Sequence, residues 1–105
     1  MNPAKADRER LVFLTDLPNV GEATAEDFRL LGFTEPRQLA GSDPLDLYRR
    51  LCVLKGKRQD PCVLDVFLSV LSFLRGEDPK PWWGFTERRK MLLEKERKGG
   101  STDFP

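Results

Sequence analysis

The chain contains no histidine, only two cysteines and one tyrosine, and its positive and negative charges nearly cancel. The absence of histidine removes the commonest general base of enzymes, and two cysteines alone do not make a zinc-binding set. A formal net charge of +1 gives no overall attraction to nucleic acid or membrane, so such binding must depend on local clusters. These absences favour a binding protein over an enzyme, with no metal and no cofactor.

Long apolar runs are also absent. No stretch reaches the length of a membrane-spanning helix, and the charged N-terminal residues are unlike a signal peptide. Two cysteines without a disulfide-rich pattern fit a reducing compartment, so we expect a cytoplasmic protein with no membrane association. The 105 residues have uniform composition and predict one domain with a modest core.

The best-defined motif is LPNVGEATAEDFRLLGF, which spans residues 17–33. Ala25, Phe28 and Leu31 recur at helical spacing after a tight loop, and the following glycine is a stop signal. We expect Asn19 to tolerate a positive φ in that loop, because asparagine adopts the left-handed conformation more readily than most residues.

Gly21 ends this loop and begins the helix. There we expect the peptide N–H groups of Gly21, Ala23 and Thr24 to point outwards, which is the arrangement by which a helix start binds phosphate. Glu22 suits the helix dipole but repels a phosphate at the same place. The basic residue that usually follows such a loop is absent.

Start and stop signals predict further helices. Aspartate–proline pairs at 43–44 and 60–61 are typical helix starts. The second pair opens the most apolar segment, whose polar stripe is Asp65, Ser69 and Ser72, and which belongs in the middle of a bundle. We expect segment 79–85 to run extended because it is rich in proline. The expected helices cover about residues 6–14, 22–31, 44–54, 61–75 and 87–98, with a short connector at 34–41.

The two halves of the chain can be aligned with a shift of 39 positions. The aligned core pairs are Leu14 with Val53, Ala25 with Leu64, Phe28 with Phe67, and Leu31 with Val70. We therefore expect an all-α fold, a bundle of about five to six helices in a double helix-hairpin-helix (SAM-like) arrangement. It would occupy residues 6–90, followed by a charged helical extension and flexible tail at 91–105.

Several motifs occur in a distinctive order: LPNVGEATAEDFRLLGF, DPLDLYRRLCVLKG, DPCVLDVFLSVL, and PWW before a basic stretch. In this the chain resembles the bacterial pathogenicity-locus family of helix-hairpin-helix proteins, and its layout is similar to the C-terminal domain of TfoX-type competence regulators. The resemblance implies a helical fold and DNA binding, and the mitomycin-resistance label of some members implies DNA repair or damage resistance. It supplies no catalytic residues.

Candidate DNA contacts fall in three groups: the first hairpin, the basic loop of the second hairpin, and the start of the last helix. They are Asn19, Val20, Gly21, Ala23, Thr24, Lys55, Gly56, Lys57, Arg58, Arg88, Arg89 and Lys90. We expect these residues to contact the phosphate backbone without strong sequence preference. The alternative for the first hairpin is a purely structural role, and for the basic loop a solvated turn.

A second function from another class stays open. The same bundle could act as a protein-interaction adaptor without nucleic-acid binding, through Trp82 and Trp83 or through the acidic face from Glu22 to Asp27. Cys52 and Cys62 are expected to be small buried hydrophobic residues, because neither has a histidine to take its proton. The oligomeric state and the choice between duplex and single strand are left open by the sequence.

Overall fold

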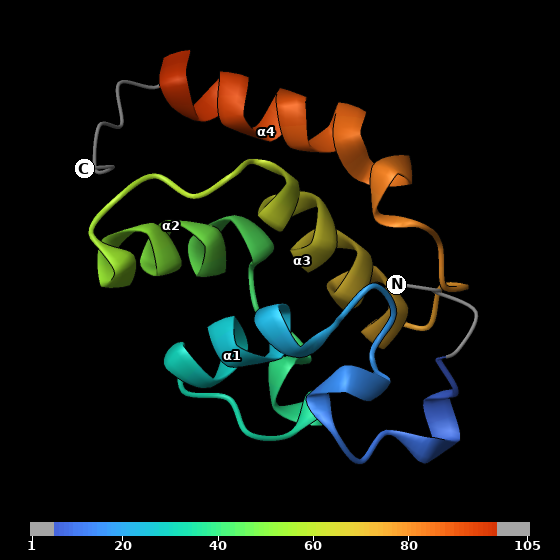
Figure 1. The fold of residues 1–105 in the computed structure, drawn as a ribbon. Helices are drawn as coiled ribbons and strands as arrows, with labels where there is room; N and C mark the ends of the chain where they lie inside the picture. Colours follow the sequence, from blue (N-terminus) through green and yellow to red (C-terminus); the bar gives the residue numbers. More distant parts are fainter. Residues whose placement is uncertain (1–5, 99–105) are drawn as a thin grey trace.

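The computed structural model describes residues 6–98. Four α-helices make up the fold: α1 (Glu22–Leu30), α2 (Pro44–Lys55), α3 (Cys62–Leu74) and α4 (Thr86–Lys98). Short 3-10 helices connect them: η2 (Arg8–Arg10), η3 (Leu14–Asp16), η4 (Pro36–Leu39) and η5 (Trp82–Phe85). Residues 6–98 contain no β-strand (Figure 1), which confirms the all-α class.

Helix α3 lies at the centre of the bundle, as its apolar sequence predicts. Most of its residues are buried, and it packs against α2, α4 and η5. Phe67 is fully buried, and its ring stacks on that of Phe28 in α1 with centroids 5.0 Å apart and planes inclined by 26°. This aromatic pair joins the two halves of the chain in the middle of the core.

The first aspartate–proline start folds as expected, whereas the second begins its helix one residue later, with Pro61 rather than Asp60 at the N-cap. The Asp43 carboxylate accepts the Leu45 N–H at 3.0 Å, and Pro44 occupies the first turn of α2. The Asp60 carboxylate accepts the Cys62 N–H at 2.9 Å at the start of α3. Helix α2 ends at Gly56, whose φ of 73° is left-handed and favours glycine. Local sequence signals therefore set the bounds of the second hairpin.

The expected first helix at 6–14 is wrong. Residues 8–10 and 14–16 form two separate 3-10 turns instead. The reason is local: the Asp7 carboxylate accepts the N–H of residue 9, and the Asp16 carboxylate accepts the N–H groups of residues 12 and 13. Such side-chain bonds compete with helical ones. Because the connector at 36–39 is also a 3-10 turn, residues 6–98 hold four α-helices rather than five or six.

The expected extended run at 79–85 is partly wrong. Its last four residues form η5, in which the Gly84 N–H donates to the Pro81 carbonyl at 3.0 Å. Phe85 is buried and anchors η5 on the core. Helix α4 then begins at Thr86 and continues without a break past residue 90, where the extension was expected to begin. The expected tail from residue 99 lies outside the described residues.

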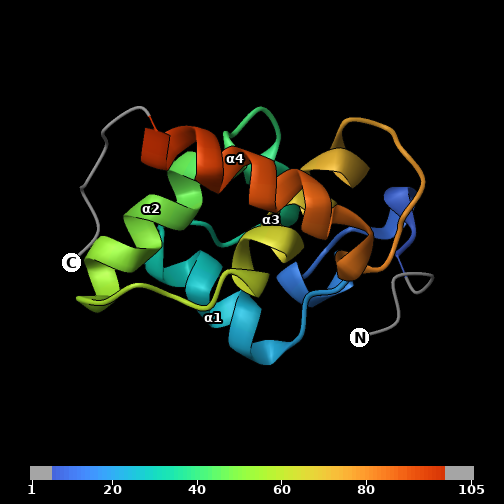
Figure 2. The same ribbon diagram turned by 90° about the horizontal axis from the view of Figure 1, so that it is seen from above.

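The polar stripe of α3 is buried rather than solvated. Asp65, Ser69 and Ser72 are each at most 2% exposed. Asp65 accepts hydrogen bonds from Thr86 and Arg89 of α4, Ser69 accepts one from Asn19, and Ser72 donates to Glu77. Helix α4 therefore covers Asp65 and the first hairpin covers Ser69, and Figure 2 shows α4 lying across α3.

Candidate nucleic-acid interface

Two residues of the first hairpin face the interior. Val20 is fully buried, and Asn19 is 4% exposed. Asn19 takes the positive φ expected of it, 65°, and its Nδ2 donates to Ser69 Oγ at 3.0 Å and to the Lys80 carbonyl at 2.8 Å. The side chains of Asn19 and Val20 hold the loop against α3 and the segment before η5, so the DNA contact expected of these two residues falls to their backbone atoms.

The start of α1 is partly open. Gly21 precedes the helix with φ −102° and ψ −170°, an extended conformation, and supplies no side-chain cap. Ala23 is exposed and Thr24 half-buried in the first turn. Glu22 carries the negative charge that would oppose a phosphate here, but its carboxylate lies 3.3 Å from the Arg29 guanidinium, which offsets part of it.

The basic loop is only partly available. Lys55 Nζ lies 2.7 Å from the Asp27 carboxylate of α1, so this lysine connects two helices and its charge is already paired. Gly56 is the helix end described above, and Lys57 and Arg58 are exposed. The Asp60 carboxylate already accepts the backbone N–H of Cys62, and this bond lowers the pKa of its carboxyl.

Arg89 is also committed to the fold. Its Nε lies 2.8 Å from Asp65 Oδ1, the arginine side chain is 15% exposed, and the aspartate side chain is fully buried. The hydrogen bond with Asp65 raises the pKa of Arg89. Arg89 therefore docks α4 on α3, and its guanidinium charge is already paired with Asp65. Its neighbours Arg88 and Lys90 are both exposed.

The structure brings cations from two distant segments around one surface hollow. Arg58, from the loop before α3, lies at this hollow together with residues of α4. The residues that line it are Arg58, Arg89, Lys90, Leu93, Glu94 and Arg97. Glu94 is engaged within the hollow, because its carboxylate lies 2.5 Å from Arg97. Arg58, Lys90 and Arg97 therefore meet at one surface that no single stretch of sequence defines, although Arg97 is paired with Glu94 and Lys90 lies 3.9 Å from Glu87.

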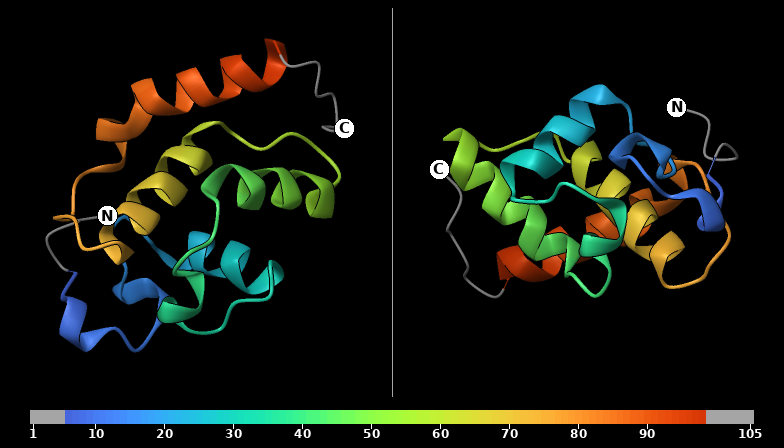
Figure 3. Two further views of the ribbon diagram at one scale, coloured as in Figure 1. Left: turned by 180° about the vertical axis from the view of Figure 1, so that it is seen from behind. Right: turned by 90° about the horizontal axis from the view of Figure 1, so that it is seen from below.

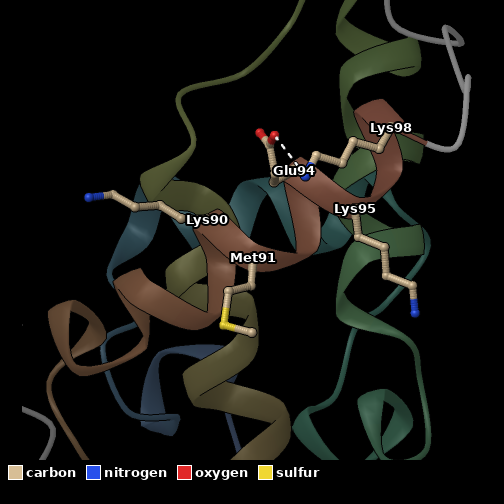
Figure 4. A pocket seen from close by; sticks show the side chains of 5 residues that line it. All are labelled: Lys90, Met91, Glu94, Lys95 and Lys98. Atoms are coloured by element: carbon tan, nitrogen blue, oxygen red, sulfur yellow. Dashed lines mark ion pairs between the residues drawn. The ribbon is translucent and has the colours of Figure 1, made fainter.

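The outer face of α4 extends this surface. Figure 4 shows Lys90 and Lys95 pointing away from the helix on different sides of Met91, whereas Lys98 turns back towards Glu94. Three cations of the last helix are not among the expected DNA contacts: Lys95, Arg97 and Lys98. The run of charged residues in that helix could have indicated them. Glu96 points the other way: its side chain is 8% exposed and lies 3.6 Å from Arg49 of α2.

The cysteines and the tryptophans are not among the residues that line this hollow. Cys52 is buried, and its sulfur accepts the Gln59 N–H at 3.3 Å. Burial, together with a hydrogen bond to Asp60, raises the pKa of the half-buried Cys62 thiol, which is the opposite of what a nucleophile needs. Trp83 is exposed on η5, with Trp82 beside it.

Metal-binding and membrane-spanning features are absent from the part of the chain that the structure describes. Between residues 6 and 98, no cluster of three or more potential metal-ligating side chains occurs. None of the helices in that range has the length and apolar character needed to cross a membrane.

Fold and surface together define a small all-α domain whose last helix and α2–α3 loop share a cationic face. The sequence comparisons place it more closely: a family model described as pathogenicity locus matches residues 7–91, and the chain belongs to this family. It is 43% identical over 91 residues to the mitomycin resistance protein McrB of Streptomyces lavendulae, covering 84% of this chain and 87% of that protein. No solved structure matches the chain.

Proposed function

We propose that this protein binds the phosphate backbone of DNA without strong sequence preference. The observation that carries the proposal is the convergence of Arg58 with Lys90 and Arg97 around one hollow. Arginine and lysine side chains supply most phosphate contacts in protein–DNA complexes, and such contacts carry no base information. The near-neutral net charge makes this local cluster the electrostatic basis of binding.

We also propose that the fold is a double helix-hairpin-helix, related to TfoX-type C-terminal domains. Phe28 and Phe67 are equivalent in the internal alignment, and their rings stack on each other. Contact between equivalent residues is expected where a two-fold relation passes through a core. Two other residue pairs of the alignment are also buried: Ala25 with Leu64, and Leu31 with Val70.

One aligned pair does not support the duplication: Leu14 is 2% exposed, whereas Val53 is 60% exposed. The first arm of the first hairpin is the 3-10 turn η3 rather than a helix, so the two repeats differ most there. Figures 2 and 3 show the start of α1 and the loop at 56–61 on the same side of the molecule. A strand that crosses this side would meet the peptide N–H groups of Gly21, Ala23 and Thr24 as well as the basic loop.

The biological role proposed is resistance to DNA damage. It rests on the name of the relative, a mitomycin resistance protein, which aligns over most of both chains. Backbone binding without sequence preference suits such a role, because damage occurs at any sequence. Complementation tests the role: expression of this chain in a mitomycin-sensitive host should raise survival, and a variant defective in DNA binding should not.

DNA binding is tested by fluorescence anisotropy of two labelled duplexes of unrelated sequence over a range of salt concentrations. The double variant Lys90→Gln, Arg97→Gln removes two candidate phosphate contacts. The slope of log affinity against log salt should become shallower by roughly 0.9 for each phosphate that is no longer neutralised, equally on both duplexes. The matched control is Arg10→Gln, Arg75→Gln, which removes the same charge from exposed positions that lie outside the hollow.

If the parent binds neither duplex at low salt, the DNA proposal fails. The second candidate, a protein-interaction adaptor, then takes its place. The exposed apolar side chains favour that candidate: Trp83 is 62% exposed, and Val53 and Leu54 of α2 are 60% and 53% exposed. An adaptor predicts loss of a protein partner on changing these residues and no salt-dependent binding to DNA.

A further inference from the structure

The segment 79–88 presents an exposed tryptophan on a fixed support. Phe85 is buried in the core, and the Lys80 carbonyl accepts a hydrogen bond from the buried Asn19 side chain at 2.8 Å. The Gly84 N–H donates to the Pro81 carbonyl at 3.0 Å. Between these anchors Trp83 remains 62% exposed. Its exposure is therefore a property of an ordered segment that is tied to the core on both sides.

The surroundings of Trp83 leave room for a flat ligand. Trp82 meets it in a T-shaped arrangement, with ring centroids 5.6 Å apart and planes inclined by 83°. The next residue, Gly84, has open space around it, since a Cβ atom there would meet no heavy atom within 4 Å. Trp82 thus contacts one side of the Trp83 ring, and position 84 has no side chain that could cover it.

Two cations flank the tryptophan pair in the chain. Arg88 and Lys80 are both exposed, and neither has an ion-pair partner within 4.0 Å among residues 6–98. A hydrogen bond from Ser72 lowers the pKa of the Glu77 carboxyl, and the charges of Arg75, Lys80 and Arg88 lower it further.

The acidic residues of this segment are mostly engaged. Glu77 accepts the Ser72 hydroxyl, and Glu87 lies 3.9 Å from Lys90. Asp78 is the remaining carboxylate. An exposed indole between two available cations is the combination by which proteins bind single-stranded nucleic acid: the ring stacks on a base, and the cations bind the adjacent phosphates.

We propose that Trp83 stacks on an unpaired base of single-stranded DNA, with Lys80 and Arg88 on the flanking phosphates. This inference rests on the proposed DNA binding and adds to it a preference for unpaired bases, whose faces are free, over bases stacked inside a duplex. It is independent of the hollow at Arg58, which would hold backbone in either form of DNA.

The test uses the two tryptophans separately. In the variant Trp82→Phe, Trp83 is the only tryptophan, and its fluorescence is followed during titration with a short oligothymidylate. The control ligand is an abasic strand of equal length, which has the same phosphates and no bases. We expect the oligothymidylate to quench Trp83 fluorescence and the abasic strand to leave it unchanged.

The second readout is the affinity of the protein for the oligothymidylate, for the abasic strand and for a duplex, each measured by fluorescence anisotropy. Trp83→Ala should weaken binding of the oligothymidylate roughly tenfold, within the range for loss of one stacked base, and should leave the abasic strand and the duplex unaffected. Trp82→Phe serves as the matched control, and circular dichroism verifies that each variant is folded.

The possible failures are distinguishable. If the abasic strand and the oligothymidylate bind equally and Trp83 fluorescence does not change, the stacking inference is overturned and backbone binding stands. If no strand binds at low salt, the proposed function falls and the inference falls with it. If Trp83→Ala loses a protein partner while its DNA affinities equal those of the parent, Trp83 is a protein contact instead.

Discussion

The substitution Arg89→Met tests how α4 is held on the bundle. Arg89 is the only cation within 4.0 Å of the Asp65 carboxylate among residues 6–98, and Asp65 is fully buried. Methionine keeps much of the side-chain volume but removes the charge. The carboxylate is then left with one hydrogen bond, from the Thr86 hydroxyl at 2.8 Å. The variant therefore measures the cost of a buried charge without its partner.

The size of the effect follows from this burial. Removal of one partner of a buried ion pair costs about 3–5 kcal/mol. Because the Arg89 side chain is 15% exposed, we take the lower end, about 3 kcal/mol. A domain of this size has a free energy of unfolding of about 5–15 kcal/mol. The variant should thus lose a large part of its stability, beginning with α4, which has no buried residue of its own.

The assay is urea unfolding followed by circular dichroism. With an m-value of about 1.5 kcal/mol/M, a loss of about 3 kcal/mol lowers the urea midpoint by about 2 M. Arg88→Met is the matched control: it makes the same change one position earlier on the exposed side of α4. Its free energy of unfolding should stay within about 0.5 kcal/mol of the parent.

A second variant separates the buried charge from other causes. Asp65→Asn keeps the shape of the side chain and removes its charge, so Asp65→Asn, Arg89→Met should be more stable than Arg89→Met alone. Equal midpoints for Arg89→Met and Arg88→Met would refute the reasoning. So would a double variant that is less stable than Arg89→Met, because the instability would then not come from an uncompensated carboxylate.

The other predictions concern the core, the tyrosine and a cysteine. Phe67→Ala should lower the free energy of unfolding by about 3–5 kcal/mol, because it empties the centre of the core; a thermal midpoint within a few degrees of the parent would contradict this. Tyr48 is the sole tyrosine, and burial raises its pKa to about 12. The stability that protonated Tyr48 gives the folded protein should be fully present below pH 10 and be lost as the pH rises through about 12. Absorbance should therefore show tyrosinate forming near pH 12 in the folded protein and near pH 10 in urea. A folded-state transition near pH 10 would show that the ring is not buried. Cys62 should react with iodoacetamide more slowly than a free thiol, since its pKa is raised; rapid stoichiometric labelling of the folded protein at neutral pH would count against this.

The sequence alone determined the helices that carry strong local signals. Asp43 with Pro44, the pair at 60–61, and Gly56 act through bonds to residues within one turn, so their effect does not depend on the rest of the fold. The central place of α3 was predictable for a similar reason, because a helix that is apolar on nearly every side has to be buried. The positive φ of Asn19 followed from its residue type.

The same local physics explains the wrong prediction at the N-terminus. The apolar spacing of residues 11 and 14 fits a helix, but the carboxylates of Asp7 and Asp16 accept nearby peptide N–H groups and favour 3-10 turns. Helical apolar spacing and the carboxylate bonds to nearby peptide N–H groups favour different local structures there, and the sequence pattern does not show which of them is stronger.

Only the tertiary structure decided which charged residues are available for a partner. Lys55 and Arg89 look like free cations in the sequence, but Asp27 and Asp65, from other helices, pair with them. Conversely, Arg58 and Arg97 are far apart in the chain and line the same hollow. The energy of an ion pair depends on distance and burial, and for residues on different helices both are set by how the helices pack.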